Sequence, residues 1–227
     1  MVHSTKHGCF ISYKKEDKIY VKIIAKRLDE LDIPCSYLDR TINSENIDTV
    51  ISVLRTQYMN NKPVTLFLIG LHSYEDTKER WRKTWGNYYP HPEYNEQSFV
   101  IRELRATLSD YDGNPRHGLL GIVLPKMYDK IFKGTYRCSH CGEAINYIAL
   151  DDDTVIREFH RNYYLVPVNE KCGHYNEDGR YCVLCKLDEF LDNPSIFIDK
   201  AYDKSISKIA DSVYYKNIDH DYKLRDE

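Results

Sequence analysis

The sequence predicts an α/β fold, a doubly wound, flavodoxin-like parallel sheet that carries a cysteine-rich insertion. Over residues 6–130, short apolar runs alternate with longer segments whose apolar side chains recur at helical spacing. Two of the runs, 63–69 and 118–124, contain almost no polar residue. Such runs are typical of central strands in a parallel sheet that helices cover on both faces. The periodicity then weakens, and five of the seven cysteines lie between residues 136 and 190.

Each element is predicted from its own local pattern. In chain order we expect strands at 9–13, 33–38, 63–69 and 118–124, and between them helices at 17–31, 46–58 and 98–108. Strands that alternate with helices indicate βαβ units with right-handed crossovers. Ligands of such sheets bind beyond the carboxyl ends of the strands.

The chain divides into three parts by composition. We expect residues 1–135 to form an α/β domain and residues 136–190 to form a zinc-ribbon-like insertion. Residues 191–227 complete the α/β domain, with a last strand expected at 195–198 and a final helix at 205–215.

Composition excludes several classes of function. The 227 residues carry a net charge of −3 with acidic and basic side chains interspersed, which gives no basic surface for a nucleic acid. No apolar run has transmembrane length, and the first eight residues contain no apolar signal segment. We therefore expect a cytoplasmic protein without membrane contact, whose seven cysteines are metal ligands or free thiols rather than disulfides.

Two C-x-x-C pairs predict a structural zinc site. Two residues between ligands allow both thiolates of a pair to reach one tetrahedral Zn²⁺, and four thiolates leave no open position for catalysis. The alternatives are unliganded thiols or a redox pair. The expected ligands are Cys138, Cys141, Cys182 and Cys185, with Cys172 and His174 as possible replacements.

The usual motifs of nucleotide-binding enzymes and hydrolases are missing from the sequence. It contains no G-x-G-x-x-G after the first strand, no Walker A motif, no G-x-S-x-G and no H-E-x-x-H. The candidates for chemistry are therefore the exit of the first strand and the helix at 98–108.

These two segments resemble boxes of TIR domains. The first strand and its exit read Phe10-Ile-Ser-Tyr-Lys-Lys-Glu-Asp17, like the TIR opening box, in which an apolar strand ends in Ser-Tyr before a loop that leads to Asp. The helix begins Ser98-Phe-Val-Ile-Arg-Glu-Leu104, similar to the TIR helix that carries the catalytic Glu of NAD-cleaving members. Phe99 stands where the family usually has Trp. The resemblance implies that Glu103 is catalytic.

The TIR-like branch that includes the ThsB proteins of Thoeris antiphage systems is more similar still. Its features are an Asp-Arg-Ser/Thr after the second strand, here Asp39-Arg40-Thr41, and a helix that ends in Tyr58 before a strand that closes on Gly70. A Gly-rich strand such as 118–124 follows the Glu helix. The resemblance covers residues 7–125.

The resemblance implies a function and its partners. The chain would cleave the nicotinamide N-glycosidic bond of NAD, making an ADP-ribose-derived signal. In this branch a cyclic or conjugated product is favoured, and it would activate a ThsA-like effector. The pocket would be completed in a homo-oligomer or a phage-triggered assembly. The aromatic segment 81–94 is either the subunit surface or a lid.

Glu103 is the expected catalytic residue. It lies on the flank of an apolar stripe, so we expect its carboxylate to be half-sheltered at a pocket rim, the alternative being a solvated charge. Asp17 suits a helix cap as well as the site. The expected substrate-binding residues are Phe10, Ser12, Tyr13, Lys14, Asp39, Arg40, Ser98 and Phe99.

Two other functions remain open from the sequence. One is a non-catalytic TIR-like adaptor or sensor that uses the cysteine-rich insertion for docking. The other is a nucleoside-processing enzyme similar to deoxyribosyltransferases, which also place a Glu beside a ribose.

Overall fold

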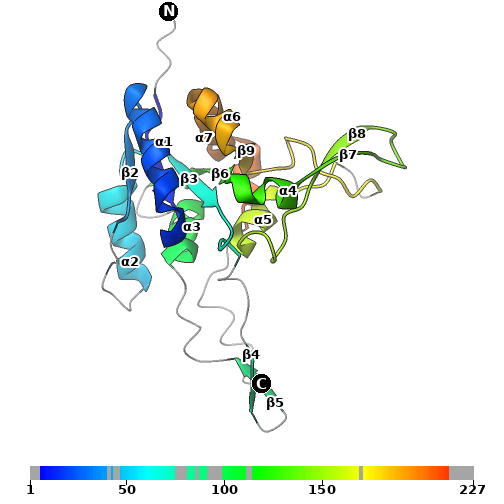
Figure 1. Cartoon of the computed structure of the whole chain (residues 1–227), viewed down its shortest axis with the longest axis horizontal. Helices are drawn as coiled ribbons and strands as arrows, with labels where there is room; N and C mark the ends of the chain where they lie inside the picture. The colour runs from blue at the N-terminus through cyan, green and yellow to red at the C-terminus, as the bar shows by residue number, and fades with distance from the viewer. Residues whose placement is uncertain are drawn as a thin grey trace, which may run out of the picture.

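A five-stranded parallel sheet organises the structure. The computed structural model describes residues 6–39, 42, 47–74, 81–84, 87–90, 99–110, 114–168 and 171–214. The sheet consists of β1 (Cys9–Ser12), β2 (Cys35–Tyr37), β3 (Val64–Ile69), β6 (Gly118–Val123) and β9 (Val183–Lys186), in the order β2-β1-β3-β6-β9. Counted along the chain, this order is 2-1-3-4-5, which is typical of doubly wound sheets. The predicted parallel α/β sheet is confirmed (Figure 1).

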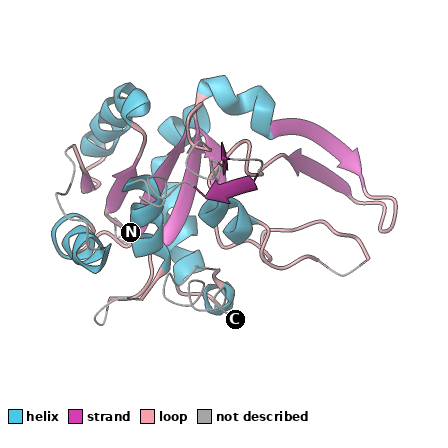
Figure 2. Ribbon diagram, turned by 90° about the horizontal axis from the view of Figure 1, so that it is seen from below, coloured by secondary structure: helices cyan, strands magenta, loops and turns pink. Residues whose placement is uncertain are grey.

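Helices cover both faces of this sheet (Figure 2). One face packs against α1 (Lys18–Glu30), α6 (Leu187–Asp192) and α7 (Pro194–Ser205). The opposite face packs against α2 (Ile47–Val53), α3 (Phe99–Leu108) and α5 (Arg157–Tyr163). The described residues also form short helical segments, namely η1 (Lys15–Asp17), η2 (Leu54–Tyr58), η5 (Pro125–Met127), α4 (Tyr128–Ile131) and η6 (Lys208–Ser212).

Strand β6 explains why two helical layers are needed. Leu120 and Ile122 belong to the core on the α1 side, whereas Leu119 and Val123 belong to the core on the α3 side. Successive side chains of a strand point to opposite faces, so an uninterrupted apolar strand exposes apolar surface on both.

The last strand of the sheet differs from the prediction. It is β9, within the segment expected to belong to the insertion, and not 195–198. Residues 195–198 lie inside α7, which Pro194 opens at its first turn, a position where proline costs no hydrogen bond. The helix predicted at 205–215 is also wrong, because α7 ends at Ser205 and, up to residue 214 where the description ends, only the short η6 follows.

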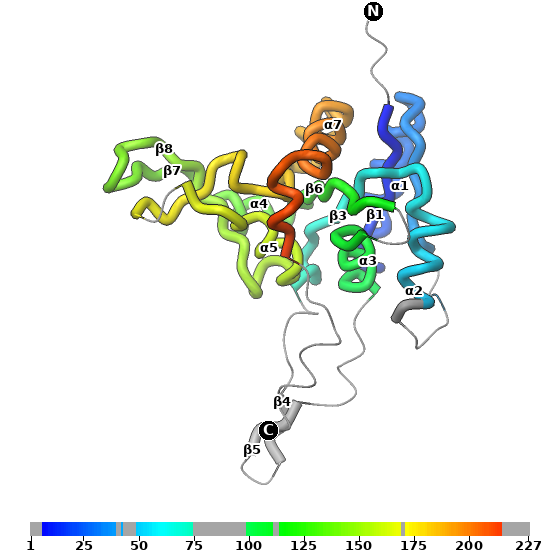
Figure 3. Tube along the Cα trace, turned by 180° about the vertical axis from the view of Figure 1, so that it is seen from behind, coloured from blue at the N-terminus to red at the C-terminus, as the bar shows by residue number. Residues whose placement is uncertain are grey.

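Between α4 and α5 the chain leaves the sheet as a hairpin. Strands β7 (Phe132–Arg137) and β8 (Ala144–Ile148) pair antiparallel and extend away from the main sheet, beside the loop that leads to β9 (Figures 1 and 3). Strands β4 (Trp81–Thr84) and β5 (Asn87–Pro90) form another antiparallel pair. In the described part of the chain, none of the helices combines the length and the apolar character needed to cross a membrane.

Two glycines of β6 allow neighbouring elements to come close. A Cβ at position 118 would lie 2.1 Å from the backbone oxygen of Ala201 in α7, and one at position 121 would lie 2.4 Å from the Phe159 ring. We expect Gly118→Ala to lower the free energy of unfolding by about 1–3 kcal/mol, since a helix backbone must shift. Chemical denaturation would measure this loss. In a Phe159→Leu background, Gly121→Ala should lower the free energy of unfolding by less, whereas the loss caused by Gly118→Ala should stay the same. If the Phe159→Leu change reduced both losses equally, these contacts would be contradicted.

Candidate functional site

A serine and a glutamate meet at the carboxyl edge of the sheet. Ser12 is the last residue of β1, and its Oγ donates a hydrogen bond to Glu103 Oε2 on α3 over 2.6 Å. The helix is held in place because Thr107 Oγ1, one turn further on, donates to Thr65 Oγ1 of β3 over 2.8 Å. The exit of β1 and helix α3 thus contribute to one contact, at the edge where ligands of doubly wound sheets bind.

The Glu103 side chain is buried, with 5% of the residue exposed, and not half-sheltered at a rim as expected. Helix α3 is enclosed because it packs against α2 and α5 as well as the sheet, so the flank of its apolar stripe is covered too. Burial raises the pKa of Glu103 to about 8, and the hydrogen bond from Ser12 offsets only part of this shift. The group is therefore a neutral acid at pH 7.

Asp17 is a second buried carboxyl group at this edge. It occupies the N-cap of α1 but makes no side-chain capping hydrogen bond, and its Oδ2 is buried without a hydrogen-bond partner. The carboxyl group lies against Gly70, which follows β3; a Cβ at position 70 would be 2.2 Å from Oδ2. Burial, together with the neighbouring Glu16, raises the pKa of Asp17 to about 6. The capping function considered for Asp17 is thus absent.

Tyr13 and Asp39 lie together at the exits of β1 and β2. The Tyr13 hydroxyl donates to Leu38 O over 3.2 Å and to Asp39 Oδ1 over 3.4 Å. Lys18 Nζ lies 2.5 Å from the same carboxylate oxygen, and this contact lowers the pKa of Asp39. Asp39 is therefore already paired with a cation, which reduces its capacity to accept hydrogen bonds from a ribose.

The remaining predicted substrate contacts are divided. Phe10 is fully buried in the core between β1 and α2, so it is a packing residue and not a pocket wall. Phe99 is half-buried beside the same cluster, with the Arg102 guanidinium 5.8 Å from its ring centroid. Lys14 is half-exposed just after β1. Arg40 and Ser98 lie outside the described residues, as do the side chains of segment 81–94.

Three cysteines and a histidine form a candidate metal centre. Cys138 and Cys141 lie in the turn of the β7–β8 hairpin, whereas Cys172 and His174 lie in the loop that leads to β9. Their four ligand atoms are within 4.8 Å of one another, and Cys141 Sγ is 3.3 Å from His174 Nε2. Backbone N–H groups of Cys141 and His140 lower the pKa of Cys138, which favours the thiolate that binds metals.

The second C-x-x-C pair does not take part in this centre. Cys182 and Cys185 lie at β9, where a separation of three residues directs the side chains to opposite faces of the sheet. Each is about 1% exposed, and burial raises the pKa of both thiols. The ligand set predicted with these two residues is therefore wrong, and the two possible replacements, Cys172 and His174, complete the cluster.

The Cys-Gly-His sequence at 172–174 could have indicated the two ligands that replace Cys182 and Cys185. In Cys172-Gly173-His174, the glycine has a φ of +61°, a left-handed conformation that lets two ligands one residue apart turn toward one point. By contrast, Tyr181 and Val183, which flank Cys182, are buried apolar residues typical of a strand. The C-x-x-C spacing suggested metal ligands, although the apolar neighbours of Cys182 indicated a buried strand.

Comparisons with known proteins do not identify the chain. No protein-family model matches it, and no curated protein is significantly similar to it.

Proposed function

We propose that the chain is a TIR-like enzyme that cleaves the nicotinamide N-glycosidic bond of NAD, with Glu103 as its catalytic residue. The hydrogen bond between Ser12 and Glu103 is the observation that supports it, because it joins the two TIR-like segments at the ligand-binding edge of the sheet. The proposal rests further on the resemblance of residues 7–125 to the ThsB branch of TIR-like proteins.

The chemistry requires a carboxylate near a developing positive charge. Nicotinamide leaves NAD as a neutral molecule, and the ribose becomes oxocarbenium-like in the transition state. A carboxylate in a water-poor site stabilises that charge more strongly than it would in water. We infer that Glu103 releases its proton to water when the cationic nicotinamide ring and its ribose approach, and that Ser12 then keeps the carboxylate oriented.

The product depends on the acceptor. Water would give ADP-ribose, whereas an internal hydroxyl group would give a cyclic isomer. The proposed signal is the cyclic or conjugated form, which is released in the cytoplasm and activates a ThsA-like effector. NAD processing would be triggered when the chain enters a homo-oligomer or a phage-dependent assembly. Incubation with NAD and infected-cell lysate, followed by mass analysis of the products, tests this directly.

The same geometry favours a second candidate function. A glutamic acid that is buried, neutral and hydrogen-bonded also suits a purely structural position, as in a non-catalytic TIR-like adaptor or sensor. Retained NAD cleavage that depends on Glu103 excludes the adaptor. Turnover of nucleosides without turnover of NAD would instead indicate a deoxyribosyltransferase-like enzyme.

We propose zinc as the metal of the Cys138–Cys141–Cys172–His174 cluster. Thiolate and imidazole ligands in a set of four are typical of tetrahedral structural zinc. Such a set leaves no open coordination position, so the ion would stabilise the hairpin and its neighbouring loop and would take no part in NAD cleavage.

Glu103→Gln tests the catalytic assignment. Glutamine can still accept the hydrogen bond from Ser12 but carries no negative charge, so NAD cleavage should fall by roughly 100- to 10,000-fold. Glu30→Gln, an exposed change on α1, is the control and should cleave at the wild-type rate. Chromatographic measurement of nicotinamide release gives both rates. Unchanged turnover in a folded Glu103→Gln protein would exclude this mechanism.

The raised pKa of Glu103 predicts how stability depends on pH. Between the ordinary glutamate pKa of 4.5, which applies to the unfolded chain, and the folded-state pKa of about 8, the folded chain holds a proton that the unfolded chain has lost. The free energy of unfolding therefore falls as pH rises through this window. Relative to Glu103→Gln, the wild type should lose roughly 2–4 kcal/mol between pH 5 and pH 8, measured by urea denaturation. If the free energies of unfolding of the two proteins changed with pH in parallel, the pKa of Glu103 would not be raised in the folded chain.

Metal analysis tests the revised ligand set. Protein purified without chelator should contain about one zinc per chain. Cys172→Ser should lower that content because it removes a ligand, whereas Cys182→Ala should retain the metal because Cys182 belongs to the core. Elemental analysis of the three proteins decides the matter, and zinc loss in Cys182→Ala with retention in Cys172→Ser would restore the ligand set expected from the sequence.

A further inference from the structure

A cavity beside the metal centre is lined by tyrosines. It has a volume of about 310 Å³, at the lower end of the range for small-molecule sites. One wall comes from the β7–β8 hairpin and the other from the loop that leads to β9. The residues that define its chemistry are Tyr136, Tyr147, Tyr164, Tyr175, His174 and Arg180.

The hairpin wall presents two half-exposed aromatic rings. Tyr136 pairs with Ile145 across the hairpin, and Tyr147 lies two residues further along β8, so both rings stand on the same face. They are 45% and 53% exposed and meet edge to face at 6.1 Å. Exposed rings at a cavity offer faces on which a planar group can stack.

The loop wall adds a cation, Arg180, whose guanidinium lies 4.6 Å from the centroid of the Tyr163 ring. Arg180 lines the cavity and is fixed by a hydrogen bond from Nη2 to Tyr175 O, at 2.7 Å. Among the described residues that line the cavity there is no aspartate or glutamate. This charge pattern disfavours a cationic ligand and favours an aromatic ligand with a negative charge.

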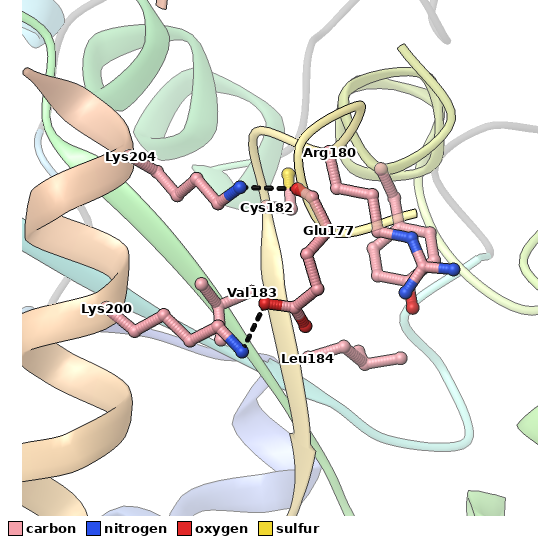
Figure 4. Close-up of a pocket in the computed structure, with 8 residues that line it drawn as sticks. Glu177, Arg180, Cys182, Val183, Leu184, Lys200 and Lys204 are labelled. Atoms are coloured by element: carbon pink, nitrogen blue, oxygen red, sulfur yellow. Dashed lines mark hydrogen bonds and ion pairs between the residues drawn. The ribbon is translucent and has the colours of Figure 1, made fainter. Parts of the chain in front are cut away.

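Arg180 also lines a second, smaller cavity of about 40 Å³ (Figure 4). There Lys200 and Lys204 of α7 surround Glu177: Lys200 Nζ is 2.5 Å from Glu177 Oε2, and Lys204 Nζ contacts the backbone oxygen of the same residue. Lys204 also interacts electrostatically with Asp178, so the two lysines are balanced by two carboxylates and Arg180 provides the surplus positive charge next to the tyrosine-lined cavity.

The metal cluster connects the two walls of the tyrosine-lined cavity. Cys138 and Cys141 belong to the hairpin, Cys172 and His174 belong to the opposite loop, and His174 also lines the cavity. A metal bound by these four residues would fix the separation of the walls. His174 is buried, and its Nδ1 has no hydrogen-bond partner, so the cluster would be the main constraint on this ring.

We propose that this metal-supported cavity binds a nucleotide, with the base stacked on the ring of Tyr147, edge to face with Tyr136, and a phosphate on Arg180. Stacking of a base on an aromatic side chain contributes about 1–3 kcal/mol, and tyrosine faces accept any base. A guanidinium group suits a phosphate in charge and geometry. The site is separate from the Ser12–Glu103 contact, which lies at the carboxyl edge between β1 and α3.

Isothermal titration of the zinc-loaded chain with 5′-AMP tests the proposal. Tyr147→Ala should weaken binding by about tenfold or more, whereas Tyr147→Phe keeps the ring and should bind within about twofold of the wild type. Adenosine should bind more weakly than 5′-AMP because it lacks the phosphate. Removal of the metal with a chelator should abolish binding, and added zinc should restore it.

Glu103→Gln separates this site from the proposed active site. This variant should bind 5′-AMP like the wild type whether or not it still cleaves NAD, because Glu103 does not line the tyrosine-lined cavity. The proposal is overturned if 5′-AMP does not bind, if Tyr147→Ala binds it like the wild type, or if Glu103→Gln loses binding. Equal binding of 5′-AMP and adenosine would overturn the phosphate contact with Arg180.

Discussion

The need to cover both faces of a parallel sheet governs this structure. Strand β6 is apolar on both faces, so helices must pack on each side; the crossovers between parallel strands supply α1, α2, α3 and α5, and the chain after β9 supplies α6 and α7. All carboxyl ends then meet at one edge. Ser12 of β1 meets Glu103 of α3 at this edge, and Asp17 at the start of α1 lies there against Gly70, which follows β3.

The same packing explains the electrostatics of the edge. Helix α3 contacts the sheet, α2 and α5, so its only glutamate is removed from water along with its apolar neighbours. Desolvation outweighs the single hydrogen bond from Ser12, and the acid stays neutral near pH 7. A neutral buried acid costs less than a buried charge, and it can become a strong electrostatic group once a cation enters the site.

The hairpin region is stabilised in a different way. Most residues of β7 and β8 are exposed, so this part of the chain buries too little apolar surface to be held by hydrophobic packing. A metal bound to two residues of the hairpin and two of the loop would supply the missing constraint. Metal coordination would then set the shape of the cavity between the hairpin and the loop, whereas strand and helix packing sets the shape of the sheet edge.

The sequence by itself determined the elements whose pattern is local. The first four strands of the sheet and the helices between them follow from periodicity, and the sequence singled out Ser12 and Glu103 as separate site candidates without predicting the hydrogen bond between them. Only the tertiary structure decided how deeply Glu103 is buried and which cysteines meet. Burial depends on helices far apart in the sequence. Likewise, Cys182 and Cys185 have the spacing of metal ligands, but a strand directs them to opposite faces, and β9 is a strand because β6 is there to pair with it.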